Sequence, residues 1–132
     1  MIDVNTLRPS GIRRKLMMSA VHVVTTAGNY IIGHFPHGAT LRGIWFVPTV
    51  ALTVADEVMD IGITATGKTI IDAVTVPYTT SAIGTPVDIF QTKGTTGGLT
   101  ELAAGATVWA TPTGASTAGT GFFVIEYEDR NN

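Results

Sequence analysis

The fold is decided by residues 30–63, YIIGHFPHGATLRGIWFVPTVALTVADEVMDIGI. This stretch predicts a strand, a tight turn, a long strand, an acidic turn and another strand. Residues 30–35 are apolar and rich in β-branched side chains, which favour strands. Residues 36–39, PHGA, predict a turn because proline fixes φ and glycine accepts positive φ. Residues 40–50 are the most apolar segment of the chain.

The long strand is apolar on both faces. Because side chains alternate along a strand, one face is expected to carry Leu41, Trp45 and Val47. The other face is expected to carry Ile44, Phe46 and Val50. Such a strand is either central in a sandwich or lies at a subunit contact. Proline has no N–H for the ladder and marks an edge or a bulge, which here favours the subunit contact. We therefore expect four residues in the core or between protomers: Trp45, Phe46, Val47 and Pro48.

Further apolar, β-branched runs predict strands at 19–26, 70–76, 87–90, 107–111 and 121–128. In the last of these, Phe123, Ile125 and Tyr127 share one face. Phe122 and Val124 share the other with Glu126 and Glu128. Two Gly/Thr-rich segments read as loops: 91–100, which should project, and 113–120, which should be a flexible turn.

This pattern gives about eight short strands with turn signals at the spacing of a sandwich or barrel. The expected fold is all-β, a jelly-roll-like antiparallel β-sandwich over residues 19–132. Residues 1–18 are expected to form an N-terminal arm, in which proline and glycine oppose a long helix.

The charge is low and unevenly spread. Charged residues are 14% of the chain, against about 25% in typical domains. A surface with so few charges suggests cover by identical subunits, so we expect an oligomer. The first 42 residues carry 5 − 1 = +4 and the remainder 3 − 9 = −6. This asymmetry suits arm-to-neighbour contacts but is too weak to predict nucleic-acid binding.

The cations of the arm are Arg8, Arg13, Arg14 and Lys15. They could contact an acidic partner surface, or they could be a solvated terminal charge run; both interpretations stay open. The chain has no cysteine, which excludes disulfides and thiolate metal sites. The sequence predicts neither a signal peptide nor a membrane-spanning segment.

One segment matches the phosphate-loop pattern G-x-x-x-x-G-K-[ST]: Gly62 to Thr69, GITATGKT. In a nucleotide site Lys68 would neutralise phosphates and Thr69 would bind magnesium at the start of a helix. Here the following residues are β-branched and end at Pro77. We therefore interpret the segment as a glycine turn joining two strands, and expect no cofactor.

The remaining polar motifs are incomplete. His34 and His37 flank one turn, but no third metal ligand is evident, so polar loop histidines are expected. No serine lies in a G-x-S-x-G elbow, and catalysis is not expected. Asp56, Glu57 and Asp60 lack the spacing of a calcium loop and predict a solvated turn.

Three segments carry a resemblance to a known family. They are Phe35–Ile44 (FPHGATLRGI), Met59–Gly62 (MDIG) and Gly119–Tyr127 (GTGFFVIEY). Over residues 20–128 the chain resembles small jelly-roll capsid decoration, or cement, proteins of tailed bacteriophages. The resemblance implies a homotrimer bound to the major capsid protein on the virion surface, made in the host cytoplasm, with no membrane, nucleic-acid or small-molecule partner. No residue role transfers, because such proteins act through surfaces.

The expected function is thus a non-enzymatic virion structural protein that stabilises a capsid shell. In this hypothesis the cationic arm contacts acidic capsid surface. The alternative is a carbohydrate- or receptor-binding module of a phage tail or head fibre, using the two Gly/Thr loops. Trp45 and Trp109 could stack on sugars in such a module, although packing is the commoner use of a strand tryptophan.

Overall fold

The computed structural model describes residues 14–24, 28–79, 82–90, 97–114 and 116–129. Within these ranges the protein is all-β, with no helix and therefore no helix that could cross a membrane. The strands are β1 (Arg14–Met18), β2 (His22–Val23), β3 (Tyr30–Phe35), β4 (Ala39–Val50), β5 (Glu57–Gly62), β6 (Ile71–Val76), β7 (Val87–Asp88), β8 (Glu101–Leu102), β9 (Ala106–Pro112) and β10 (Thr120–Asp129).

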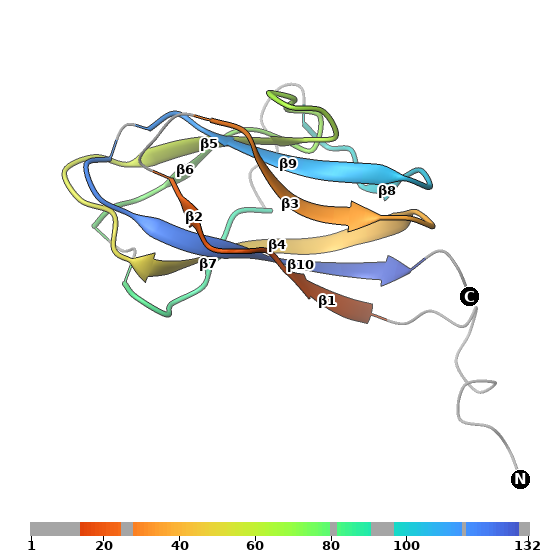
Figure 1. Ribbon diagram of the computed structural model, residues 1–132, viewed down its shortest axis with the longest axis horizontal. Helices are drawn as coiled ribbons and strands as arrows, with labels where there is room; N and C mark the ends of the chain where they lie inside the picture. Colours follow the sequence, from red (N-terminus) through yellow and green to blue (C-terminus); the bar gives the residue numbers. More distant parts are fainter. Residues whose placement is uncertain (1–13, 25–27, 80–81, 91–96, 115, 130–132) are drawn as a thin grey trace, which may run out of the picture.

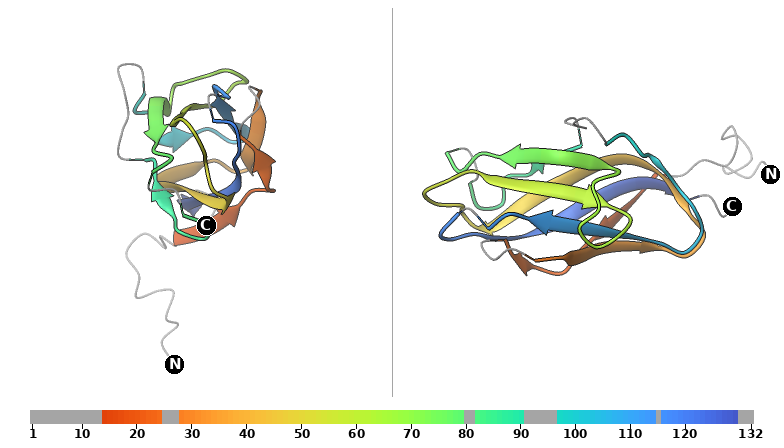
Figure 2. Two further views of the ribbon diagram at one scale, coloured as in Figure 1. Left: turned by 90° about the vertical axis from the view of Figure 1, so that its left-hand side faces the viewer. Right: turned by 90° about the horizontal axis from the view of Figure 1, so that it is seen from above.

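The strands form two antiparallel sheets that lie one above the other (Figures 1 and 2). Sheet A has the order β1-β10-β4-β7, with β2 also pairing β10 and β8 also pairing β4. Sheet B has the order β3-β9-β5-β6. The expected all-β class and the antiparallel arrangement are confirmed.

The strands β4 and β10 form the centre of sheet A. Phe46 is the register partner of Phe123, and Trp45 is the partner of Val124. The register shifts between Thr120 and Gly121, where Gly121 pairs with Pro48 and Thr120 with Val50. Of the edge or bulge that Pro48 indicated, the structure has a bulge, with Thr49 as the extra residue beside the proline.

A second irregularity on the same strand changes which face a side chain takes. Glu126 pairs with Gly43 but Tyr127 pairs with Leu41, so Arg42 is an extra residue. Because the side-chain period of a strand is two, one extra residue moves everything beyond it to the other face. Leu41 therefore joins the buried set with Ile44 and Phe46, and its expected place beside Trp45 is wrong.

The core fills the space between the two sheets. Its largest side chains come from both layers: Phe35, Ile32, Met59 and Ile61 from sheet B, and Leu41, Ile44, Phe46, Phe123 and Ile125 from sheet A. The rings of Phe46 and Phe123 lie 5.2 Å apart between centroids. Full burial of each such side chain contributes about 1.5–3 kcal/mol, so this layer dominates the stability of the domain.

The first strand begins before the expected boundary at residue 18. Residues Arg14–Met18 form β1, whose register with β10 runs from Arg14–Glu128 to Met18–Val124. Of the expected strand over 19–26, the described residues 19–24 contain the two residues of β2, and residues 25 and 26 lie outside the described residues. The described part of the expected arm is thus an edge strand of sheet A, while Arg8 and Arg13 lie outside the described residues.

The phosphate-loop lookalike is a connection between two antiparallel strands. β5 ends at Gly62, and β6, which follows, is a strand and not a helix. The N–H of Gly67 donates to the carbonyl of Thr64 at 2.9 Å, closing a tight turn. Lys68 forms an ion pair with Asp72, with Nζ 3.7 Å from Oδ1. The interpretation as a glycine turn joining two strands is confirmed.

The acidic segment near residue 57 is not a solvated turn throughout. Glu57 is the first residue of β5, and it is fully buried. Its carboxylate accepts hydrogen bonds from the hydroxyl of Thr113 and from the N–H groups of Gly114 and Ser116. The expectation for Glu57 is therefore wrong, and the segment expected to be a flexible turn is anchored to this carboxylate.

Candidate interaction surface on sheet A

The outer face of sheet A, which points away from sheet B, carries two contrasting bands. On β1, β4 and β10 the register places alternate residues side by side on this face. One half of the face is the apolar band, which we define as Leu16, Met18, Trp45, Val47, Phe122 and Val124. Leu16 and Met18 are 67% and 66% exposed, large values for apolar side chains that stand next to one another.

Trp45 lies over a glycine in its own strand. A Cβ placed on Gly43 would come within 2.4 Å of the Cη2 atom of Trp45. The indole therefore uses the space that a side chain at this position would fill. Next to it is a hollow of about 240 Å³, which we call the socket. The socket is lined by apolar residues alone: Leu16, Trp45, Val47, Pro86 and Val124.

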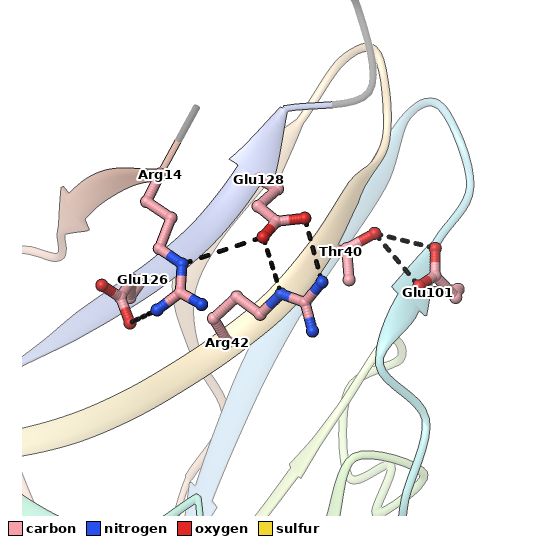
Figure 3. A network of polar contacts seen from close by, with 6 residues as sticks. All are labelled: Arg14, Thr40, Arg42, Glu101, Glu126 and Glu128. Carbon is pink, nitrogen blue, oxygen red and sulfur yellow. Dashed lines mark hydrogen bonds and ion pairs between the residues drawn. The ribbon is translucent and has the colours of Figure 1, made fainter. Parts of the chain in front are cut away.

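The other half of the face is the charged band, drawn in Figure 3. Arg42 makes two parallel contacts with Glu128: its Nε lies 2.9 Å from Oε1 and its Nη2 lies 3.0 Å from Oε2. Arg14 reaches Glu126 at 3.7 Å and Glu128 at 3.8 Å. Across β4, the hydroxyl of Thr40 donates to both carboxylate oxygens of Glu101, at 2.9 and 3.0 Å. The band thus links β1, β10, β4 and β8.

The fork geometry of Arg42 and Glu128 sets their ionisation. The hydrogen bond from Arg42 lowers the pKa of Glu128 from its usual 4.5. The same hydrogen bond and the carboxylate's charge raise the pKa of Arg42. Two parallel N–H···O contacts favour the charged form of both groups, so the pair stays ionised at neutral pH.

The residues expected in the core or at a subunit contact divide between the core and the outer face of sheet A. Phe46 is fully buried in the core, and Pro48 is buried at the bulge. Trp45 is half-buried on the outer face, where Val47 is 8% exposed. The strand is therefore apolar on both faces for two reasons: one face packs on sheet B and the other carries the apolar band.

Two of the cations expected to contact a partner, Arg14 and Lys15, also have contacts inside the chain. Arg14 is in the charged band, and Lys15 Nζ lies 3.0 Å from Asp129 Oδ2. Both side chains keep substantial exposure, 61% and 47%. They are thus tied to β10 in part but remain open to an outside surface.

A different hollow lies beside Trp109 on β9. It measures about 500 Å³ and is lined in part by Ile63, Leu99, Thr107 and Trp109. Trp109 is half-buried and faces out of sheet B, opposite Ile31 of β3 and Gly62 of β5. This position combines an aromatic side chain with a concavity of the size that small ligands occupy.

The histidines near the first turn do not gather further ligands. His34 Nδ1 lies 2.9 Å from the hydroxyl of Thr107, its register partner on β9. Within the described ranges, no group of three or more His, Asp or Glu side chains could hold a metal ion.

Sequence reasoning missed the two most exposed members of the apolar band. Both residues belong to the segment expected to be an arm. Residues 14–18, RKLMM, are two cations followed by three apolar residues, so no polar–apolar alternation marks a strand. The face that Leu16 and Met18 share is defined only by the pairing of β1 with β10.

Comparison with known proteins gave no match. No family model, no curated protein and no solved structure matches this chain.

Proposed function

We propose that the protein is a non-enzymatic virion structural protein, a capsid decoration or cement protein that binds the outside of a phage capsid and stabilises the shell. The observation that carries this proposal is the outer face of sheet A, which fits contact with another protein chain, and a decoration protein acts through contacts between protein chains, including those between its own copies. This face joins an exposed apolar band to a charged band on a small domain with few charges. A contiguous apolar patch rimmed by polar residues is typical of protein–protein contact sites.

We further propose that the sandwich is a jelly roll. If β1 and β2 count as one strand and β8 as an addition, eight strands remain. A jelly roll folds a long antiparallel ribbon in which the first strand pairs with the eighth, the second with the seventh, the third with the sixth and the fourth with the fifth. The pairs β1–β10, β3–β9, β4–β7 and β5–β6 support this proposal.

The proposed mechanism is multivalent. A homotrimer made in the host cytoplasm would contact several major capsid subunits at once, and each contact would raise the effective concentration of the next. On the described part of the chain, Lys15 is the candidate cation for acidic capsid surface, because it alternates with Arg14 along β1 and so lies off the outer face of sheet A. Such a role uses surfaces and not a catalytic centre or a cofactor.

The test is co-sedimentation with bare capsid shells of the phage that encodes the chain. We expect the purified protein to sediment with the shells, to saturate at a fixed copy number, and to raise the temperature at which the shells open. Lys15→Glu should weaken binding, whereas Lys68→Glu, on a distant turn, is the matched control. A chain that stays in the supernatant at all concentrations would refute the proposal.

A second candidate function attaches to the hollow beside Trp109. In a carbohydrate- or receptor-binding module, the indole would stack on the C–H face of a sugar ring. A glycan array probed with the native chain and with Trp109→Ala tests this. Binding lost in Trp109→Ala but kept in Trp45→Ala would favour this function over the decoration role.

A further inference from the structure

The socket on sheet A lies next to an exposed side chain, Met18, that could enter the same socket on a second copy of the chain. Its walls come from β1, β4, β10 and the residue before β7. Met18, on β1 and in register with Val124, stands at the edge of the same face with two thirds of its surface exposed. An unbranched, polarizable side chain such as methionine adapts readily to an irregular apolar hollow.

We propose that the partner of this face is a second copy of the chain, which places the Met18 side of its β1 strand in the socket of the first. This inference rests on the proposed function in one respect, because that function requires copies of the chain to associate. It departs from the proposed homotrimer, because the contact is reciprocal and joins copies in pairs. It adds which surface makes the contact and which side chains fill it.

The area of the face fits a partner of protein size. The strands of sheet A together hold 33 residues. At about 3.4 Å along the strand and about 4.8 Å between strands for each residue, the face measures roughly 540 Å². The smaller specific interfaces bury about 600 Å² per partner, so the whole face is close to one side of such a contact.

The charges of the face favour a copy of itself over a strongly charged partner. The charged band holds two cations and three anions: 2 − 3 = −1. Since both signs are present, an acidic or a basic partner would meet like charges in part of the band. A second copy carries the same cations and anions, so the cations of one copy can face the anions of the other.

One orientation satisfies both bands together. Arg14 lies at the β1 edge of sheet A, and Glu101 lies at the opposite edge, on β8. A second copy turned so that its β1 edge covers the β7–β8 edge places Arg14 opposite Glu101. The same turn brings Met18 over Trp45, Val47 and Pro86, since these belong to the β4–β7 side of the face.

The first test is the native mass of the purified full chain, measured by light scattering over a range of concentrations and at low and high salt. We expect an oligomer that persists in high salt, because apolar contacts are not screened. Met18→Glu would bury an unpaired carboxylate and should weaken association roughly tenfold or more. Ile31→Glu is the matched control, because Ile31 is 52% exposed on the outer face of sheet B. Met18→Ser serves if the glutamate variant does not fold.

A charge-exchange cycle tests the orientation. Arg14→Glu and Glu101→Arg should each weaken association several-fold, and the double variant should recover it. Unfolding curves of the dilute protein show whether either change acts through the stability of one copy. A double variant no better than the worse single variant would overturn the proposed orientation.

The outcomes separate this inference from the decoration role. A chain that is monomeric at every concentration, or an oligomer as tolerant of Met18→Glu as of Ile31→Glu, overturns the inference even if the chain binds capsid shells. An oligomer that Met18→Glu dissociates supports the inference even if no shell is bound, in which case the decoration role alone falls.

Discussion

The Oε2 atom of Glu57 accepts a hydrogen bond from the N–H of Ser116 at 3.1 Å, 59 residues further along the chain. The Ser116 hydroxyl in turn donates to the carbonyl of Ala55, so the two segments are joined in both directions. Among the described residues, these two side chains are the buried polar ones. A fully buried carboxylate needs such donors, since an unpaired charge inside a protein is costly.

Removing this carboxylate should destabilise the domain. Glu57→Ala leaves the donors of Thr113, Gly114 and Ser116 without their acceptor, and each unsatisfied buried group costs about 1–3 kcal/mol. We expect a loss of about 3 kcal/mol or more for Glu57→Ala and a smaller loss for Glu57→Gln, measured by urea unfolding. The same change at a partly exposed carboxylate, Glu126→Gln, is the control and should cost under about 1 kcal/mol. Equal losses in Glu57→Gln and Glu126→Gln would show that the hydrogen bonds of Glu57 add no more stability than those of a partly exposed carboxylate.

The Arg42–Glu128 pair should make stability depend on pH in a defined window. The pKa of Glu128 is lowered in the folded protein, so its ionised form stabilises the fold above the unfolded pKa. That contribution should be complete at neutral pH and decline as the pH falls below about 4.5, through the lowered folded pKa. The measurement is the unfolding midpoint of the native chain minus that of Glu128→Gln, from pH 7 to pH 3. In an Arg42→Met background the difference should be small at every pH; a difference independent of pH in the native background would contradict the assignment.

Two neighbouring glycines should respond differently to the same substitution. Gly38 and Gly105 both have positive φ, +78° and +85°, and both donate their N–H to the carbonyl of Phe35. A Cβ on Gly38 would lie 2.5 Å from the carbonyl oxygen of Leu102, whereas a Cβ on Gly105 would meet nothing within 4 Å. Gly105→Ala should therefore cost only the backbone strain, about 1–2 kcal/mol. Gly38→Ala should cost about 1–3 kcal/mol more, because the two turns must separate. Denaturant unfolding of both variants checks this, and equal costs would mean that the turns separate easily.

Lys68 should not support nucleotide binding. The strand β6 follows the Gly62–Thr69 turn, so the phosphate-binding end of a helix has no counterpart there. Isothermal titration of the native chain with magnesium and ATP should give no saturable heat. Lys68→Ala should change stability by less than about 1 kcal/mol, since the Lys68–Asp72 pair is exposed on the lysine side. Saturable binding that Lys68→Ala abolishes would contradict the assignment of this segment as a turn.

The sequence predicted the parts of the fold that depend on local alternation. The two faces of β10 follow the expected division, with Phe123 and Ile125 buried and Phe122 and Val124 on the outer face. Met59 and Ile61 are buried as their period-two spacing indicates. These predictions held because the strands are regular over the residues concerned.

The errors arise where a distant partner decides the outcome. The extra residue at Arg42 follows from how β4 pairs with β10, more than 80 residues away, and the neighbouring Gly43 is only a general sign of a bulge. The sequence predicts that Glu57 is solvated, because its hydrogen-bond donors on Thr113, Gly114 and Ser116 lie far away along the chain. The strand β1 likewise exists because β10 offers it an edge. The candidate surface was therefore recognised on β4 but missed on β1.

The register of β1 with β10 has a practical consequence for engineering. Arg14 is opposite Glu128, so β1 begins and β10 ends at the same end of the sandwich (Figure 1). Fusion partners added before Arg14 and after Asp129 would start out side by side. A short peptide joining the two positions could close the chain into a circle, and new ends could then be cut in the connection between β4 and β5, at the opposite end of the domain. Such a permuted chain would carry fusion partners at the end of the sandwich that holds the β4–β5 connection.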